Sequence, residues 1–209
     1  MLPAPFFFIP YPPLMARPKA FDEEAALQKA LDTFWLRGYA ATSMQELVER
    51  MGINRFSLYA AFGDKHQLYV RALDHYQQQS QQRLLALAAA SAGLRAPARI
   101  RQVLELLLPP DDPAAAPRGC FLVNATTERL PHDADTAALV SQNQQFLETL
   151  LTEILTQGQA RGETSHAATP PAQAQLLISV LNGMRVMAQA NSDPQMLRNV
   201  VETTLLALT

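Results

Sequence analysis

The chain has 209 residues, of which 48% are hydrophobic, and its 17 Lys and Arg against 19 Asp and Glu give a formal net charge of −2. This composition is ordinary for a globular protein of one large or two small domains, and it excludes a basic body as a nucleic-acid-binding surface, so any such contact needs a local patch. The single cysteine, Cys120, excludes an intrachain disulfide framework and a multi-cysteine zinc site, which favours a cytoplasmic location.

The first residues, MLPAPFFFIPYPPL, contain three consecutive Phe, but no Lys or Arg precedes them and Pro interrupts the apolar run. These features argue against a secretory signal peptide. Met15 begins MARPKAFDEE, which reads as a natural protein start. We therefore expect residues 1–15 to be a disordered Pro-rich leader or an upstream extension of the reading frame. Elsewhere no apolar run approaches the ~20 residues of a membrane-spanning helix, so no membrane partner is expected.

The first two predicted helices follow from apolar spacing and helix-end signals. Apolar residues at helical spacing behind Asp22, Glu23 and Glu24 predict a helix that ends near Gly38. In TSMQEL, Ser43 with Glu46 three residues on predicts a capping box and a short second helix, which ends at Gly52.

A third short helix and a long fourth helix come next. Asn54 is a suitable cap for a helix ending at Gly63, and Asp64 with Gln67 has the spacing of another capping box, which opens a helix extending to about residue 90. Two short helices joined by a tight Gly-containing turn are typical of a helix-turn-helix, whose second helix enters the DNA major groove.

The segment NRFSLYAAFGDK has few residues that could form a core-facing side of a helix. Ile53, Leu58 and Phe62 have the spacing to face inward and anchor the third helix. The remaining side chains are then free to face outward, as a groove-reading helix requires.

The chemistry of the outward residues suits DNA. Arg55 can grip guanine O6 and N7, Ser57 is short enough to reach a base edge or a phosphate, and Ala60 can touch a thymine methyl. Tyr59 offers a hydroxyl to phosphate, and Lys65 adds charge at a helix N-terminus that already favours anions. Read singly, Arg55 and Lys65 would be solvated surface charges and Tyr59 a core residue.

With these residues in place, the sequence resembles the DNA-binding domain of the tetracycline-repressor (TetR) family from about Phe21 to Leu68. The resemblance rests on FWLRGYAATSM, ELVERMGI and NRFSLYAAFGDKHQLY, which fall in register with the family pattern. It implies an all-α homodimeric repressor that binds a palindromic operator on double-stranded DNA and is released by a small ligand or a chemical signal. Repression is the family's usual mode.

The resemblance also implies a role for individual positions. One departure from the family stands at Phe56, where many relatives have Pro or Gly; Phe56 could pack on a thymine methyl. The implied contacts are backbone or flanking bases for Ser43 and Gln45, bases for Arg55 and Ser57, phosphates for Tyr59 and Lys65, and the minor groove for an arm with Arg17 and Lys19.

We expect residues 16–66 to form the helix-turn-helix domain and residues 67–209 a helical sensing and dimerisation domain. In the second, helices are predicted at about 66–90, around 100–107 and at about 137–159, and PPDDPAAAP and GETSHAATPP are predicted breaks.

Two final helices, in QAQLLISVLNGMRVMAQA and MLRNVVETTLLAL, are apolar on most of their circumference. Such helices need to bury a second face, which predicts a two-fold four-helix bundle with another copy. A well-buried monomer core is the alternative, and the family resemblance also points to dimerisation through this pair.

Two sensing hypotheses remain open. Cys120 stands after the Pro-rich loop, at or near a helix N-terminus with Arg118 close by, where a thiolate is favoured. The resemblance includes a subgroup with Gly-Cys at the start of the sixth helix, in some members of which that cysteine reacts with electrophiles or oxidants; a free Cys is also commonly a buried apolar residue. The competing hypothesis is a reversible apolar ligand in a pocket lined by Phe146, Leu150, Met184 and Met187, residues that are more often plain core.

Other classes of protein have less support. An enzyme with Cys120 as nucleophile and His132 as base lacks an orienting residue and a phosphate loop, and the four His are too scattered for metal-ligand spacing, so neither a metal nor a cofactor is expected. A dimeric helical adaptor without sequence-specific DNA binding would have no reason to keep Arg55, Ser57, Tyr59 and Lys65 together. The salt dependence of binding distinguishes a DNA-binding protein from such an adaptor, because phosphate contacts weaken steeply as salt rises.

Overall fold

The computed structural model describes residues 21–108, 118–190 and 193–209, and within these ranges the backbone is helical without a β-strand. The predicted all-α fold is confirmed. The leader 1–15, Arg17, Lys19 and the PPDDPAAAP segment lie outside the described residues. The helices in chain order are α1 (Glu23–Arg37), α2 (Met44–Met51), α3 (Arg55–Phe62), α4 (Lys65–Ala90), α5 (Ala96–Leu107), α6 (Phe121–Glu128), the 3-10 helix η1 (Leu130–His132), α7 (Ala134–Ala160), α8 (Pro170–Ala190) and α9 (Pro194–Leu206).

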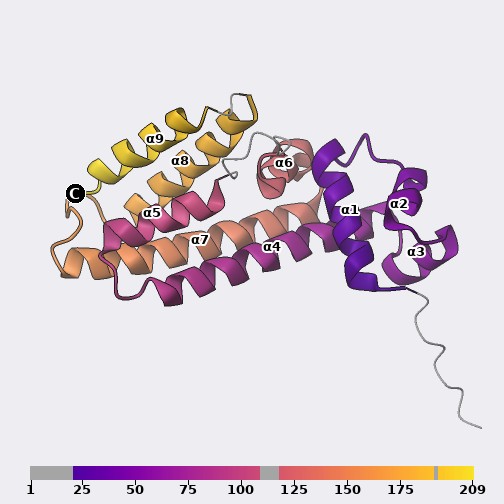
Figure 1. The fold of residues 1–209 in the computed structure, drawn as a ribbon, viewed down its shortest axis with the longest axis horizontal. Helices are drawn as coiled ribbons and strands as arrows, with labels where there is room; N and C mark the ends of the chain where they lie inside the picture. Colours follow the sequence, from indigo (N-terminus) through magenta and orange to yellow (C-terminus); the bar gives the residue numbers. More distant parts are fainter. Residues whose placement is uncertain (1–20, 109–117, 191–192) are drawn as a thin grey trace, which may run out of the picture.

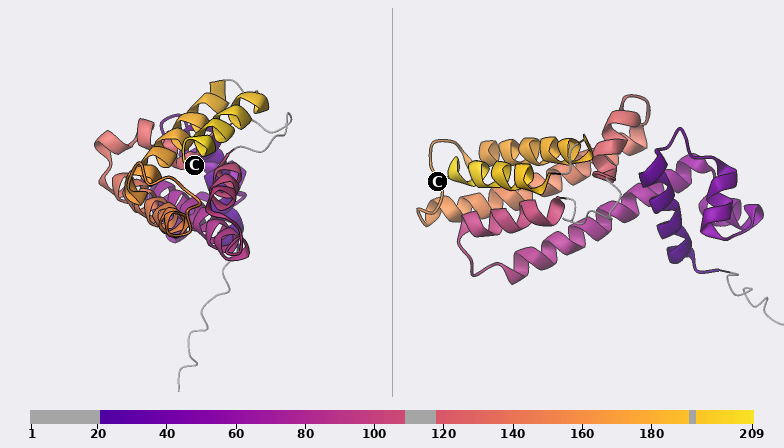
Figure 2. Two further views of the ribbon diagram at one scale, coloured as in Figure 1. Left: turned by 90° about the vertical axis from the view of Figure 1, so that its left-hand side faces the viewer. Right: turned by 45° about the horizontal axis from the view of Figure 1, so that its top comes forward.

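The molecule is elongated, with α1, α2 and α3 gathered at one end (Figure 1). Helices α4 and α7 run side by side along its length, and α5, α8 and α9 lie over them. The end-on view shows this layering, with α8 and α9 on the side away from α4 (Figure 2). The C-terminus lies at the end opposite α1–α3, and α4 continues without a break across the domain boundary expected at 66–67.

Two separate hydrophobic clusters make up the core. The proximal cluster joins α1–α3 and the first half of α4 to α6; its larger buried members include Leu31, Phe34, Leu47, Leu58, Tyr69 and Phe121. The distal cluster joins the second half of α4 to α5, α7, α8 and α9, and includes Leu84, Ile100, Leu104, Leu151, Leu177 and Leu181. Burial of each such side chain stabilises the fold by about 1.5–3 kcal/mol, so each cluster anchors its own end of the molecule.

The predicted helix ends of the first domain are largely confirmed. Asn54 caps α3 by accepting from Ser57 N, and Gly52 ends α2 in the left-handed conformation at φ 70°. The capping box of Asp64 and Gln67 is reciprocal. Gly63 has φ 74° and ψ −140°, a backbone conformation that residues with a Cβ rarely adopt, and a Cβ there would also displace the capping Gln67 side chain, so this position favours glycine.

One predicted cap is only half formed. Ser43 Oγ accepts from Glu46 N at 3.1 Å, as expected. The Glu46 carboxylate instead accepts from Arg37 at 2.6 Å and from Arg50 at 3.2 Å. A charge-assisted bond to arginine is stronger than a bond to a backbone N–H, so Glu46 joins α1 to α2 instead of closing the box.

Two predicted boundaries in the second domain were wrong. Helix α7 begins at Ala134, not near 137, because Asp133 accepts from Thr136 N and caps the helix before the apolar stripe starts. Helix α8 begins at Pro170, so Pro170 and Pro171 form its first turn and do not belong to the preceding break. Proline is tolerated there because the first N–H groups of a helix have no partner within it.

Candidate nucleic-acid interface and sensing region

Helix α3 is anchored by its inner face and presents its outer face to solvent. Leu58 is 0% exposed, and Phe62 and Ile53 are buried in the proximal cluster. Phe56, on the outer face, is 83% exposed. A large aromatic side chain that the fold leaves exposed is a feature of a contact surface, because a partner can bury it.

Other predicted DNA-contact residues surround Phe56. Arg55 and Tyr59 are exposed neighbours one turn apart, with the guanidinium carbon 5.7 Å from the ring centre and Nη2 donating to Oη at 3.4 Å. Ala60 is exposed and Ser57 half-buried on the same helix. This arrangement gathers Arg55, Phe56, Ser57, Tyr59 and Ala60 on α3, as the sequence spacing indicated.

Ser43 and Gln45 lie at the start of α2 and are exposed. The Ser43 hydroxyl accepts the α2 capping bond, and Gln45 Nε2 donates to Glu49 at 2.8 Å. Both side chains are thus held in position at the surface by short local bonds.

Lys65 is more enclosed than its predicted phosphate contact implied. Its Nζ lies 4.3 Å from the centre of the Tyr39 ring. Burial lowers the pKa of Lys65, the Glu128 charge raises it and the Arg129 charge lowers it further. The ammonium therefore also takes part in a polar seam between the two domains.

The seam joins the α1–α2 turn to the end of α6. Glu128 accepts from Tyr39 N at 2.9 Å and from Ala40 N at 2.8 Å. The Arg129 guanidinium lies 4.0 Å from the centre of the Tyr39 ring, a cation–π contact. The sequence reasoning missed this seam because the paired groups lie almost ninety residues apart and no local pattern links them.

Asp133 forms the second half of the seam. Its carboxylate lies 3.1 Å from His66 Nε2 and accepts from Thr136 and from Arg129 at 3.0 Å. Burial opposes ionisation, but the hydrogen bonds from His66, Thr136 and Arg129 outweigh it and hold the pKa of Asp133 well below its usual range. Asp135 brings a further carboxylate within 4.8 Å of this group. Since Asp133 is already bonded by protein donors, the cluster is an anchoring site for α7 on α4.

Cys120 is the N-cap residue of α6, as predicted, and is 3% exposed. Tyr76 Oη donates to its Sγ at 3.6 Å. Arg118 does not accompany the thiol: its guanidinium pairs with Asp32 at 3.0 Å and lies 5.8 Å from the centre of the Trp35 ring. Cys120 is therefore packed where α6 meets α4 and α1.

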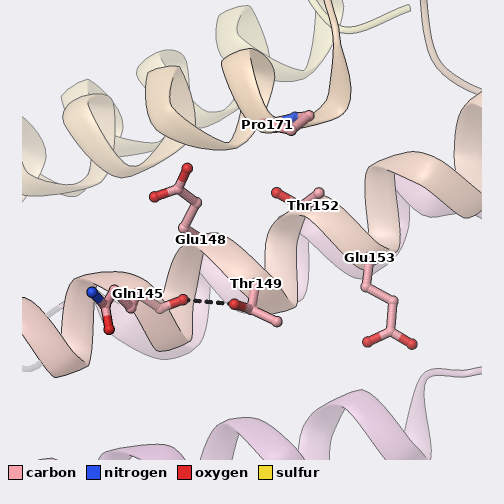
Figure 3. A pocket seen from close by; sticks show the side chains of 6 residues that line it. All are labelled: Gln145, Glu148, Thr149, Thr152, Glu153 and Pro171. Carbon is pink, nitrogen blue, oxygen red and sulfur yellow. Dashed lines mark hydrogen bonds between the residues drawn. The ribbon is translucent and has the colours of Figure 1, made fainter.

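The four predicted pocket residues are only partly brought together. Leu150 and Met184 are buried in the distal cluster and Phe146 packs against it, whereas Met187 is 50% exposed. An open hollow of about 450 Å³ lies elsewhere, along α7 and the start of α8 (Figure 3). It is lined by Gln145, Glu148, Thr149, Thr152, Glu153 and Pro171, and none of the four predicted pocket residues is among them.

The sequence profile described as "Bacterial regulatory proteins, tetR family" matches residues 26–72, and that of the "Tetracyclin repressor-like, C-terminal domain" matches residues 96–204. The chain belongs to the TetR family. The predicted class, a DNA-binding transcriptional regulator, is confirmed; the TetR family consists of regulators, not enzymes. No helix in the described ranges has both the length and the apolar character to cross a membrane.

Relatives of this chain match it over nine tenths of its length. The chain is 32% identical over 192 residues to the HTH-type transcriptional repressor ComR of Escherichia coli (strain K12), covering 90% of each chain. It is 28% identical over 200 residues to the uncharacterized HTH-type transcriptional regulator YezE of Bacillus subtilis (strain 168), covering 93% of this chain and 100% of YezE. Among solved structures, a cysteine mutant of the TetR family regulator CifR complexed with 26bp double-strand operator DNA is 30% identical with a TM-score of 0.74, covering 93% of this chain and 100% of CifR.

Proposed function

We propose that the protein is a homodimeric repressor that binds a palindromic operator through α3. The observation that carries this proposal is the outer face of α3, where Arg55, Phe56 and Tyr59 stand in solvent on a helix whose other face is fixed in the core. The CifR relative, similar along the whole chain, was solved with operator DNA, which supports the same use of this surface.

Each outward residue has a proposed role. Arg55 and Ser57 contact bases, and Phe56 and Ala60 contact thymine methyls. Contacts to the DNA backbone and flanking bases then fix the register of α3 in the groove. The phosphate or flanking contacts come from Ser43, Gln45, Tyr59 and Lys65; Arg17 and Lys19, proposed for the minor groove, lie outside the described residues.

A second copy docks on α8 and α9 in this proposal. Leu176, Val180, Gly183 and Met187 recur at helical spacing on α8 and are exposed or half-buried, and a Cβ at Gly183 would meet open space. On α9, Leu206 is also exposed. An apolar stripe of this kind marks an interface, and a two-fold pair would place the recognition helices roughly 34 to 36 Å apart, one turn of DNA.

The second domain responds to a signal. A ligand or thiol modification that moves α6 acts directly on the α1–α2 turn, since Glu128 at the end of α6 holds that turn. A reversible ligand among the helices of the second domain is the first candidate. Modification of Cys120 is the second, favoured by its position at the α6 N-cap against Tyr76.

Selection of operators from a random double-stranded DNA pool tests the proposal. The wild-type protein should enrich a palindrome, and R55A should relax the choice of base at one position of each half-site. Arg83, exposed on α4 far along the chain from α3, gives the matched control R83A, which should select the wild-type sequence.

A salt series completes the test. Phosphate contacts make operator affinity fall steeply as salt rises. An absence of enrichment, with all binding lost at modest salt, would instead favour the dimeric adaptor.

A further inference from the structure

A polar layer separates the two hydrophobic clusters. On α4, the buried stripe passes from Leu73 in the proximal cluster to Leu84 in the distal cluster through Gln77 and Ser80, both buried. On α7, Asn143 is half-buried at the corresponding place, between Val140 and Leu147. Polar side chains thus replace apolar ones at one level of the bundle.

Helix α8 contributes a charge at this level. Arg185 follows Met184 of the distal cluster and is 5% exposed. Its Nε donates to Leu107 O, at the C-terminal end of α5, at 3.1 Å. Among the described residues, its guanidinium has no other hydrogen-bond partner and no carboxylate within ion-pair distance.

Such an arrangement is costly for the protein alone. Arginine carries five N–H donors and keeps its charge in proteins. The partial negative charge of a helix C-terminus offsets only about half a unit of charge. A buried charge without a full partner is strongly unfavourable, and natural proteins retain such groups mainly at functional sites.

Two polar residues of α4, Tyr76 and Gln77, lie at the level of the polar layer. The buried Gln77 Oε1 has no hydrogen-bond partner in the described part of the chain. Burial and the neighbouring Cys120 raise the pKa of Tyr76, and the Arg185 charge partly counters them, so the phenol stands within electrostatic reach of the guanidinium. Tyr76 Oη in turn contacts Cys120 at the start of α6.

We propose that Arg185, together with Tyr76 and Gln77 of α4, forms the anion-binding end of the effector site and that the effector is a small organic acid with an apolar body. A carboxylate pairs with the fork of an arginine through two parallel bonds, and the apolar clusters on either side suit the rest of the molecule. This inference rests on the proposed function, and it names the chemical class of the signal.

Arg99 is the natural comparison. Arg99, near the start of α5, is also buried and also incompletely bonded: its Nη1 donates to Gln157 Oε1 at 2.8 Å, and its Nε has no hydrogen-bond partner in the described part of the chain. It differs from Arg185 in its place, inside the distal end of the bundle. No contact among the described residues joins Arg99 to α6, so a ligand at Arg99 would not act on the α1–α2 turn through Glu128. The variant R99Q is therefore a matched control for R185Q.

The test measures thermal unfolding of the full-length dimer with octanoate, benzoate and phenylacetate, each against its amide of the same shape. At least one acid should raise the melting temperature of the wild-type protein by several degrees while its amide does not. R185Q should lose this preference and R99Q should keep it. Equal effects of acids and amides, no stabilisation by any acid, or an unchanged preference in R185Q would overturn the proposal.

A measurement without any ligand tests the alternative explanation that Arg185 serves only to cap the C-terminal end of α5. If Arg185 is kept for an anion, R185M should melt within about 3 °C of the wild type or above it, because removal of an uncompensated buried charge offsets the lost bond. A much larger fall would show a structural role and overturn the inference. Operator binding by R185Q without effector should equal that of the wild type; loss of operator binding by the wild type itself would instead refute the proposed function.

Discussion

The carboxylate of Glu128 accepts hydrogen bonds from the backbone N–H groups of Tyr39 and Ala40 at 2.9 and 2.8 Å. Glu128 is the last residue of α6 and Tyr39 lies in the turn between α1 and α2. A displacement at the end of α6 therefore reaches the helix-turn-helix through two bonds.

Replacement of Glu128 with Ala should lower the free energy of unfolding by about 1 kcal/mol, because two N–H groups lose their acceptor while water remains able to reach them. Urea unfolding of E128A measures this. E153A, which removes an exposed glutamate from α7, should leave stability within about 0.5 kcal/mol. Equal effects of the two substitutions would contradict the role of Glu128. E128A should also bind operator with altered affinity while E153A does not.

Phe56 should matter for DNA and not for folding. Since its ring is 83% exposed, F56A should change the free energy of unfolding by less than about 0.5 kcal/mol and still weaken operator binding measurably. L58A removes a fully buried side chain on the inner face of the same helix and should lower the free energy of unfolding by about 2–5 kcal/mol. Thermal unfolding and a fluorescence anisotropy titration on each variant give both quantities. Unchanged operator affinity in F56A would remove Phe56 from the proposed interface.

The exposed apolar stripe on α8 predicts how a charge substitution within it and one outside it affect dimerisation. Met187 is 50% exposed on α8, and Leu85 is 54% exposed on α4. M187E should shift the dimer towards monomer, because a carboxylate would be buried without a partner at the interface. L85E should leave the dimer intact. Sedimentation velocity at several concentrations distinguishes the species, and dissociation by L85E alone would place the interface elsewhere.

The low pKa of Asp133 makes a contribution to stability that depends on pH. A group whose pKa is depressed in the folded state stabilises the fold above its unfolded pKa, about 4 for aspartate, and this contribution is lost as pH falls below that value. D133N should therefore be less stable than the wild type at pH 7, and the difference should shrink as pH is lowered from 4 towards 2. Parallel urea unfolding across this range checks the sign. A difference that is constant with pH would show that the carboxylate charge is not responsible.

Cys120 offers a test of the thiol signal. Because the side chain is 3% exposed, its reaction with a thiol reagent in the folded dimer should be much slower than after unfolding. If modification is a signal, labelled wild-type protein should release operator DNA, and C120S should be resistant to the same treatment. Release that is identical in C120S would leave the reversible ligand as the only proposed signal.

Local signals in the sequence predicted the first domain well. Asn54, Asp64 and Gly52 act on residues within one turn, so their effects are visible in the sequence itself. The pairing of Glu128 with the α1–α2 turn depends on the tertiary fold, and no spacing rule could reveal it. Met187 shows the same limit: an apolar residue on a helix with two buried faces can point to the core or to a partner, and only the fold decides which.

The position of α6 also determines how the molecule divides. Phe121, Leu122 and Ala125 belong to the proximal cluster although they follow more than thirty residues after the end of α4. A fragment ending at residue 90 would lack these side chains and leave Tyr69 and Trp35 without their aromatic neighbour Phe121. The DNA-binding end is therefore a discontinuous folding unit, and a chimera that exchanges this end between relatives has to carry α6 along with α1–α4.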